Sequence, residues 1–135
     1  MKHQDLLDES TVAMRQAYAP YSQLFVGAAL RSASGKVYSG CNVECGAFGI
    51  GSCAERNAIA AAVRAEGTRL RIEAVAISAV DNRDTPMAIP PCGACRQLIR
   101  ELGPQAEVVF LGGEGLVYTD INALLPHNFV LTTLS

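Results

Sequence analysis

Residues 71–78, RIEAVAIS, place the tightest constraint on the fold. Their apolar side chains run almost without interruption, which is typical of a strand buried on both faces of a sheet. Such a strand needs cover on both sides, and helical patterns at residues 4–18, 52–65 and 92–102 can provide it. A chain of 135 residues is long enough for one core, so we expect a single domain over residues 1–135.

The remaining segments complete an alternating pattern. Residues 25–32 and 36–44 read as two strands joined by a short turn, which predicts an antiparallel hairpin. Residues 106–111 predict another strand, residues 112–118 an edge strand or short hairpin, and residues 120–126 a short final helix. This order predicts a three-layer α/β/α fold with a mixed five-stranded sheet, in which parallel pairing predominates beyond the hairpin.

The charge and hydropathy pattern excludes several functional classes. The formal net charge is −2, so the chain lacks the basic bias expected of a protein that contacts nucleic-acid phosphates. No apolar run approaches the ~20 residues that span a bilayer. The start, MKHQDLLDES, lacks the apolar core of a signal peptide. We therefore expect a cytoplasmic protein with no nucleic-acid or membrane partner.

Two of the predicted helices begin with cysteine. SCAER places Cys53 at the start of one helix, and PPCGACRQ places Cys92 and Cys95 at the start of another. A helix N-terminus presents free backbone N–H groups and the positive end of the helix dipole, and both favour a thiolate. Side chains of the first turn tilt toward the N-terminus, so these three thiols could converge on one zinc ion.

Three protein ligands leave the fourth tetrahedral position of zinc open for water, which is the arrangement of a catalytic site. Zinc makes hydroxide available near neutral pH by lowering the pKa of that water. Glu55, two residues after Cys53, could take a proton from the water and pass it on. Arg56 could offset the negative charge of three thiolates.

Each of these motifs also has a simpler interpretation. Ser52 and Glu55 fit a capping box, which needs no chemistry. The Cys-x-x-Cys pair could be a redox dithiol, and Cys41 or Cys45 could supply a fourth ligand to a structural zinc. A zinc-stabilised binding module without catalysis is a further possibility. Glu55 argues against that module, because a purely structural site has no use for a carboxylate beside an open metal position.

The combination of CAE with PCGACRQ resembles the zinc-dependent nucleoside and nucleotide deaminases, whose pattern is Cys or His, any residue, Glu, and then Pro-Cys-x-x-Cys. The segments YAPYS, VGAAL, GKVYSGCNVE, CAERNA and LLPHNF extend the resemblance to the small cytidine deaminases over nearly the whole chain. It implies one Zn²⁺ per chain. The implied reaction is hydrolytic deamination of cytidine and 2′-deoxycytidine to uridine and 2′-deoxyuridine, a step of pyrimidine salvage.

The resemblance also implies roles for the matching residues of the zinc site. Cys53, Cys92 and Cys95 would hold the metal, and Arg56 would hydrogen-bond the ligand thiolates. Glu55 would act as general acid and base during attack of a zinc-activated water on the ring carbon that bears the amine.

A second set of matching residues would bind the small-molecule nucleoside. Asn42 and Glu44 would hydrogen-bond a ribose hydroxyl, and the backbone at Ala54 would face the pyrimidine edge. Phe129 matches an aromatic residue that reaches into a neighbouring subunit's pocket. The resemblance therefore implies a homotetramer with its sites at subunit interfaces.

Three positions depart from the family's usual residues. Leu24 stands where a pocket aromatic is common, and Cys45 and Phe48 stand where an amide and a tyrosine hydroxyl are usual. A less polar pocket could prefer a modified or antibiotic cytosine nucleoside. Asn42 and Glu44 argue instead for recognition of an ordinary ribose.

Overall fold

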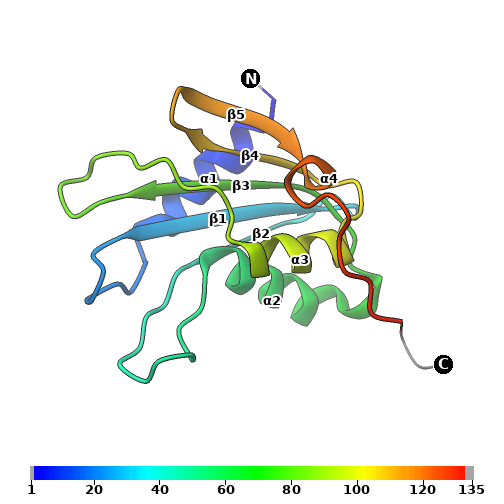
Figure 1. The fold of residues 1–135 in the computed structure, drawn as a ribbon, viewed down its shortest axis with the longest axis horizontal. Coiled ribbons are helices and arrows are strands. Elements are labelled where there is room, and N and C mark those ends of the chain that lie inside the picture. The colour runs from blue at the N-terminus through cyan, green and yellow to red at the C-terminus, as the bar shows by residue number, and fades with distance from the viewer. Residues whose placement is uncertain (1, 133–135) are drawn as a thin grey trace.

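The structure is a computed structural model that describes residues 2–132 (Figure 1). Its strands form one sheet in the order β2-β1-β3-β4-β5. In chain order the elements are α1 (Gln4–Met14), β1 (Phe25–Ser32), β2 (Val37–Cys41), α2 (Ala54–Glu66), the 3₁₀ turn η1 (Gly67–Arg69), β3 (Ile72–Val80), α3 (Gly93–Leu102), β4 (Glu107–Gly112), β5 (Gly115–Asp120) and α4 (Ile121–Leu124).

Strand directions confirm the mixed five-stranded sheet but not the expected predominance of parallel pairs. The strand β1 is antiparallel to both β2 and β3, β4 is parallel to β3, and β5 is antiparallel to β4. The expectation failed for two reasons. The connection through α2 joins β2 to β3, which run in the same direction, but β1 lies between them. The strands β4 and β5 are joined by a tight turn at Gly112 and Gly115, which permits only antiparallel pairing.

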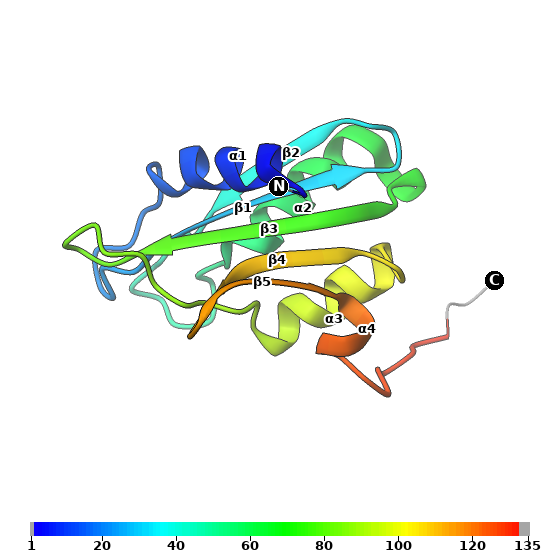
Figure 2. The same ribbon diagram turned by 90° about the horizontal axis from the view of Figure 1, so that it is seen from above.

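The central strand β3 is buried on both faces, as its sequence predicts. Ala74 and Ala76 pack with Leu6 of α1 on one face. Val75 and Ile77 belong to the larger core on the other face, which includes residues of α2 and α3. Figure 2 shows α1 on one side of the sheet and α3 on the other. The three-layer α/β/α arrangement is therefore confirmed.

The direction of β2 and β3 decides where the functional residues meet. Both strands run the same way, since each is antiparallel to β1. The helix α2 begins beyond the carboxyl end of β2, and α3 begins beyond the carboxyl end of β3. Two helix N-termini therefore lie at the same end of the sheet, the end at which ligands bind in open α/β sheets.

A close approach between α2 and β2 fixes the position of the first of these N-termini. A Cβ atom on Gly40 would lie 2.4 Å from the backbone nitrogen of Ala58 and 2.9 Å from the carbonyl oxygen of Ala54. Asn57 donates from Nδ2 to the carbonyl oxygen of Cys41 at 2.7 Å. Only glycine at position 40 lets the first turn of α2 pack this closely on the strand.

We predict that Gly40→Ala lowers the free energy of unfolding by about 1–3 kcal/mol, because the added methyl group meets backbone atoms that cannot move aside alone. Thermal and denaturant unfolding measure this loss. Gly113→Ala is the matched control, since nothing lies within 4 Å of its added Cβ. Equal stability of the two variants would contradict the packing argument.

Candidate metal centre and active site

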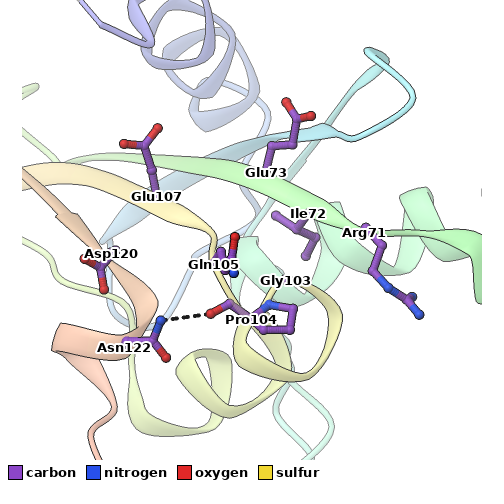
Figure 3. A pocket seen from close by; sticks show the side chains of 9 residues that line it. All are labelled: Arg71, Ile72, Glu73, Gly103, Pro104, Gln105, Glu107, Asp120 and Asn122. Carbon is purple, nitrogen blue, oxygen red and sulfur yellow. Dashed lines mark hydrogen bonds between the residues drawn. The ribbon is translucent and has the colours of Figure 1, made fainter.

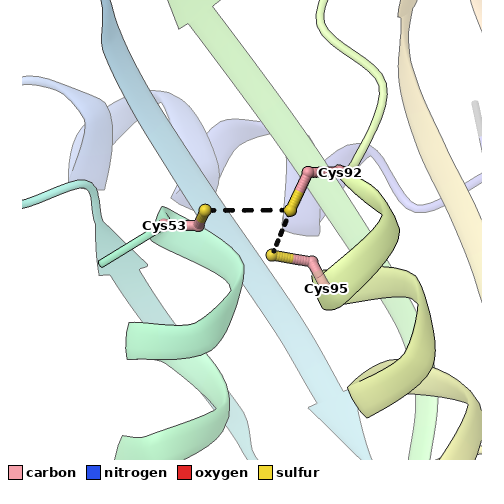
Figure 4. Close-up of side chains that lie close together, drawn as sticks. All are labelled: Cys53, Cys92 and Cys95. Atoms are coloured by element: carbon pink, nitrogen blue, oxygen red, sulfur yellow. Dashed lines mark hydrogen bonds between the residues drawn. The ribbon is translucent and has the colours of Figure 1, made fainter. Parts of the chain in front are cut away.

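Three cysteine thiols come together where α2 and α3 begin (Figure 4). Cys53 is the N-cap of α2 and Cys92 is the N-cap of α3, while Cys95 lies in the first turn of α3. The Sγ atoms of Cys53 and Cys92 are 3.9 Å apart, and those of Cys92 and Cys95 are 3.3 Å apart. All three sulfur atoms lie within 4.8 Å of one another. The convergence predicted from the two helix starts is confirmed.

The geometry of this cluster suits zinc. A tetrahedral zinc ion with Zn–S bonds of about 2.3 Å holds its sulfur ligands about 3.8 Å apart, and the observed separations lie around that value. Neither Cys41 nor Cys45 belongs to the cluster in the described part of the chain. The interpretation as a closed four-cysteine site is therefore not supported, and three thiols remain to hold the ion.

The electrostatics of the cluster also call for a cation. Burial opposes ionisation of Cys92, but the backbone N–H of Cys95 and the neighbouring thiols lower the pKa of Cys92 overall. Burial, followed by the charge of Glu55 and the neighbouring thiols, raises the pKa of Cys95 far above its usual range. The protein alone thus favours the thiolate of Cys92 and opposes that of Cys95. A bound divalent cation supplies the positive charge that full ionisation needs.

Glu55 lies in the first turn of α2 with only 4% of its surface exposed. Its burial raises the pKa of the carboxyl group above the ordinary value, against the opposing effects of its own backbone N–H, Cys95 and Arg56. The capping-box interpretation is wrong, since Cys53 rather than Ser52 is the N-cap and no side chain caps this helix. A buried carboxylate without a capping role is typical of a functional group.

Arg56 points its guanidinium at the thiol cluster. One of its terminal nitrogens donates to Sγ of Cys53 at 3.6 Å. This hydrogen bond and the charge on Cys53 raise the pKa of Arg56 further, so the group is a permanent cation beside the sulfur atoms. The predicted contact between Arg56 and a ligand thiol is present.

A short stretch of strand-like pairing joins Asn42 and Glu44 to the metal centre. Val43 exchanges two backbone hydrogen bonds with Ser52, at 3.0 and 2.8 Å. Ser52 directly precedes Cys53, so residues 42–44 are held beside the start of α2. Tyr18 pairs with the same stretch on its other side, through hydrogen bonds with Asn42 and Glu44.

The two polar side chains of this stretch are held by the loop that precedes β1 and by the start of β1 itself. Asn42 donates from Nδ2 to the carbonyl of Leu24 at 2.8 Å and accepts at Oδ1 from the backbone N–H of Val26 at 2.9 Å. Glu44 accepts from the backbone N–H of Tyr21 and from Ser22. The hydroxyl and backbone N–H of Ser22, then that of Tyr21, hold the pKa of Glu44 below its usual range.

A cavity of about 270 Å³ connects these groups. Its walls include Asn42, Glu44, Ala54 and Glu55, so these four predicted residues share one pocket with the thiol cluster. The full lining is Val26, Asn42, Val43, Glu44, Gly51, Ser52, Cys53, Ala54, Glu55, Arg56, Ile89, Pro90 and Cys92. Sequence reasoning did not single out the apolar walls Val26, Ile89 and Pro90. The two prolines directly before Cys92 were the one available signal for part of this wall.

Other predicted residues lie outside this cavity. Phe129 follows α4 with 66% of its surface exposed, and its carbonyl accepts from Gln97 at 2.9 Å. Phe48 is fully exposed, and Leu24 packs against the main core. Cys45 does not line the cavity either. Within one chain, the three departures from the family pattern therefore do not form the pocket wall.

A larger cavity of about 690 Å³ lies at the opposite end of the sheet (Figure 3). Its side chains are mainly polar and include Arg71, Glu73 and Asp120, but no cysteine or histidine. Asp120 already caps α4, and Asn122 donates to the carbonyl of Pro104 at 2.9 Å. Volume alone would favour this cavity as the active site, but the thiols and the buried carboxyl group lie at the smaller cavity.

The fold and the three-thiol site define a zinc protein of the deaminase class, and comparisons with known proteins agree. The family described as cytidine and deoxycytidylate deaminase zinc-binding region matches residues 1–111. A cytidine deaminase of Halalkalibacterium halodurans is 45% identical over 131 residues, which cover 96% of this chain and 95% of that protein. The chain therefore belongs to the cytidine and deoxycytidylate deaminase family.

A solved structure and a further relative support the same assignment. The crystal structure of cytidine deaminase from Burkholderia pseudomallei superposes with a TM-score of 0.80 at 39% identity and covers 96% of this chain and 100% of that one. A blasticidin-S deaminase of Bacillus cereus is 34% identical over 106 residues, 77% of this chain and 76% of that protein.

No helix within residues 2–132 is long and apolar enough to cross a membrane.

We predict that Cys95→Ala lowers zinc affinity by more than about 100-fold, since groups that merely orient a metal ligand already change affinity about 10–100-fold. It should also lower the melting temperature, because metal binding stabilises the folded state. Zinc content after dialysis against a graded chelator measures the effect. Cys45→Ala is the control and should keep about one zinc per chain. Equal loss of zinc in both variants would contradict the three-ligand assignment.

Proposed function

We propose that this chain catalyses the zinc-dependent hydrolytic deamination of cytidine and 2′-deoxycytidine to uridine and 2′-deoxyuridine, with release of ammonia. The observation that carries the proposal is the buried carboxyl group of Glu55, which lines the same pocket as Cys53 and Cys92 of the three-thiol zinc site. Family membership and the 45% identity to a cytidine deaminase support the choice of reaction and substrate.

Glu55 moves the protons of the reaction. When bound, zinc supplies the Lewis acidity that makes a nucleophilic hydroxide available near neutral pH. Glu55 takes one proton from the attacking water and gives it to the ring nitrogen next to the reacting carbon. It then takes the second proton of that water, now on the hydroxyl of the reacting carbon, and gives it to the amine, which leaves as ammonia. Because burial raises its pKa, the carboxyl group exchanges protons closer to neutral pH than an exposed glutamate does.

The cysteine ligands and Arg56 set the charge of the centre. Three thiolates give the zinc site a net negative charge, which opposes formation of hydroxide. The two helix N-termini and the guanidinium at Cys53 reduce that charge.

Substrate binding uses the other residues of the cavity. The backbone at Ala54 faces the pyrimidine edge, and Asn42 with Glu44 binds a ribose hydroxyl at the mouth of the pocket. All three residues line the cavity, which supports these roles. Val26 and Ile89 provide apolar walls against which a pyrimidine ring can pack.

The active assembly is a homotetramer in which Phe129 of each subunit reaches a neighbour's pocket. Large apolar side chains support an assembly of this kind, since Phe48, Ile50 and Phe129 are 100%, 69% and 66% exposed in the single chain. The protein acts in the cytoplasm, in pyrimidine salvage, as one domain over residues 1–135. Its partner is a free nucleoside rather than a nucleic acid, in keeping with its net charge of −2.

An antibiotic cytosine nucleoside is the alternative substrate. The similarity to the Bacillus cereus blasticidin-S deaminase favours it, at lower identity than that of the cytidine deaminases. The polar pair Asn42 and Glu44 favours an ordinary ribose.

We predict that the zinc-loaded protein converts cytidine and 2′-deoxycytidine to their uracil products with a kcat of the order of 1–1000 s⁻¹, the usual enzyme range. A parallel assay of cytidine, 2′-deoxycytidine, 5-methylcytidine and blasticidin S, following ammonia and product, measures this. Selective turnover of blasticidin S would show that blasticidin S, rather than cytidine, is the substrate. No turnover of any amine by a zinc-loaded protein would refute the proposed function.

We predict that Glu55→Gln keeps zinc and fold but lowers kcat by about 100- to 10,000-fold, because the amide cannot carry the proton. Steady-state kinetics, zinc content and melting temperature measure the three properties. Glu73→Gln is the matched control, since its exposed carboxylate lies at the opposite end of the sheet. Full activity of Glu55→Gln would show that another group carries the proton.

A further inference from the structure

One loop, residues 19–24, holds the carboxylate of Glu44 from outside the pocket. Oε1 of Glu44 accepts the backbone N–H groups of Tyr21 and Ser22, both at 3.1 Å. Oε2 accepts the hydroxyl of Ser22. Of the polar side chains in this loop, Ser22 alone is hydrogen-bonded to Glu44 in the described structure.

The direction of the Ser22 hydroxyl is set by a further contact. Its oxygen accepts the backbone N–H of Leu24 at 3.1 Å. With an acceptor position filled in this way, the hydroxyl hydrogen is available to Glu44, which as a carboxylate can only accept. The chain of donors thus runs from Leu24 through Ser22 to Glu44.

These contacts leave one acceptor position on the carboxylate. A carboxylate offers about four lone-pair sites, two on each oxygen. Tyr21 and Ser22 together fill both sites of Oε1 and one site of Oε2. The remaining site of Oε2 can accept one hydroxyl group from a ligand in the cavity that Glu44 lines.

The backbone of Glu44 is already fixed, so the side chain is the part that needs positioning. The backbone N–H of Glu44 donates to the carbonyl of Tyr18 at 2.9 Å, and the adjacent Val43 pairs with Ser52. The carboxylate itself is partly exposed. Backbone N–H groups hold Oε1, so the hydroxyl of Ser22 is the contact that orients Oε2.

We propose that Ser22 is a positioning residue for sugar recognition: it orients Glu44 so that Oε2 accepts one secondary hydroxyl of the nucleoside. This inference rests on the proposed function of the same pocket. Ser22 does not line the cavity and acts through Glu44.

The test compares Ser22→Ala with wild type on two substrates. We expect KM for cytidine to rise about threefold to tenfold, the size of one lost hydrogen bond, while kcat changes by less than about twofold. KM for 2′,3′-dideoxycytidine, which lacks both secondary hydroxyls, should stay unchanged. A merely structural role would affect both substrates alike, and that outcome would overturn the proposal.

Two control variants test whether the effect depends on the hydroxyl of Ser22. Ser22→Thr keeps a hydroxyl and should restore the wild-type KM for cytidine. Ser34→Ala removes a hydroxyl that donates to Glu66 at 2.8 Å, a pair of the same kind that does not line the active-site cavity, and should leave KM unchanged. A rise in KM for Ser34→Ala as large as that for Ser22→Ala would count against a specific role of Ser22.

A double substitution decides whether Ser22 works through Glu44. In the Glu44→Ala background, Ser22→Ala should change KM for cytidine by less than about 1.5-fold, because the group it orients is gone. An undiminished effect in that background would overturn the proposal. Failure of wild type to deaminate cytidine would instead refute the proposed function, so the two failures are distinguishable.

Discussion

The common direction of β2 and β3 is the constraint on which the rest of the site depends. Because both strands run the same way, α2 and α3 begin at one end of the sheet and bring Cys53, Cys92 and Cys95 within 4.8 Å of one another. Two positive helix ends then face the same small volume. That field, together with a bound cation, favours the charged forms of Glu55 and Cys95, whose burial raises the pKa of both groups.

Much of the fold and of the metal centre could be predicted from the sequence, because both depend on patterns of residues that are close together along the chain. The apolar run of β3 predicted a sheet covered on both faces, and a cysteine at each of two helix starts predicted the thiol cluster. The position of β1 between β2 and β3 could not be read in this way, since strand order depends on how hairpin and crossover pack together. The sequence alone also left the capping box at Ser52 open as an alternative, because the backbone of Ser52 pairs with Val43, a contact set by tertiary structure.

The contacts that orient the substrate-binding side chains are the hardest to predict from the sequence. Ser22 and Glu44 are far apart along the chain, and the bonds between them involve backbone N–H groups that no residue pattern reveals. The effect of Leu24, Cys45 and Phe48 on substrate choice stays a prediction, since none of the three lines the cavity within one chain. Glu44, next to Cys45, lines the cavity, whereas the immediate neighbours of Leu24 and Phe48 do not. The larger cavity at the opposite end of the sheet shows in turn that volume without reactive groups does not identify a site.

The central claim is that this pocket adds water to a cytosine ring and releases its amine. Its most direct test is to incubate the zinc-loaded protein with cytidine in ¹⁸O-labelled water and to analyse the uridine by mass spectrometry. We expect uridine that carries one ¹⁸O atom at the carbon that bore the amine, with an equal amount of ammonia. Unlabelled uridine, or no uridine from a protein that holds its zinc, would contradict it.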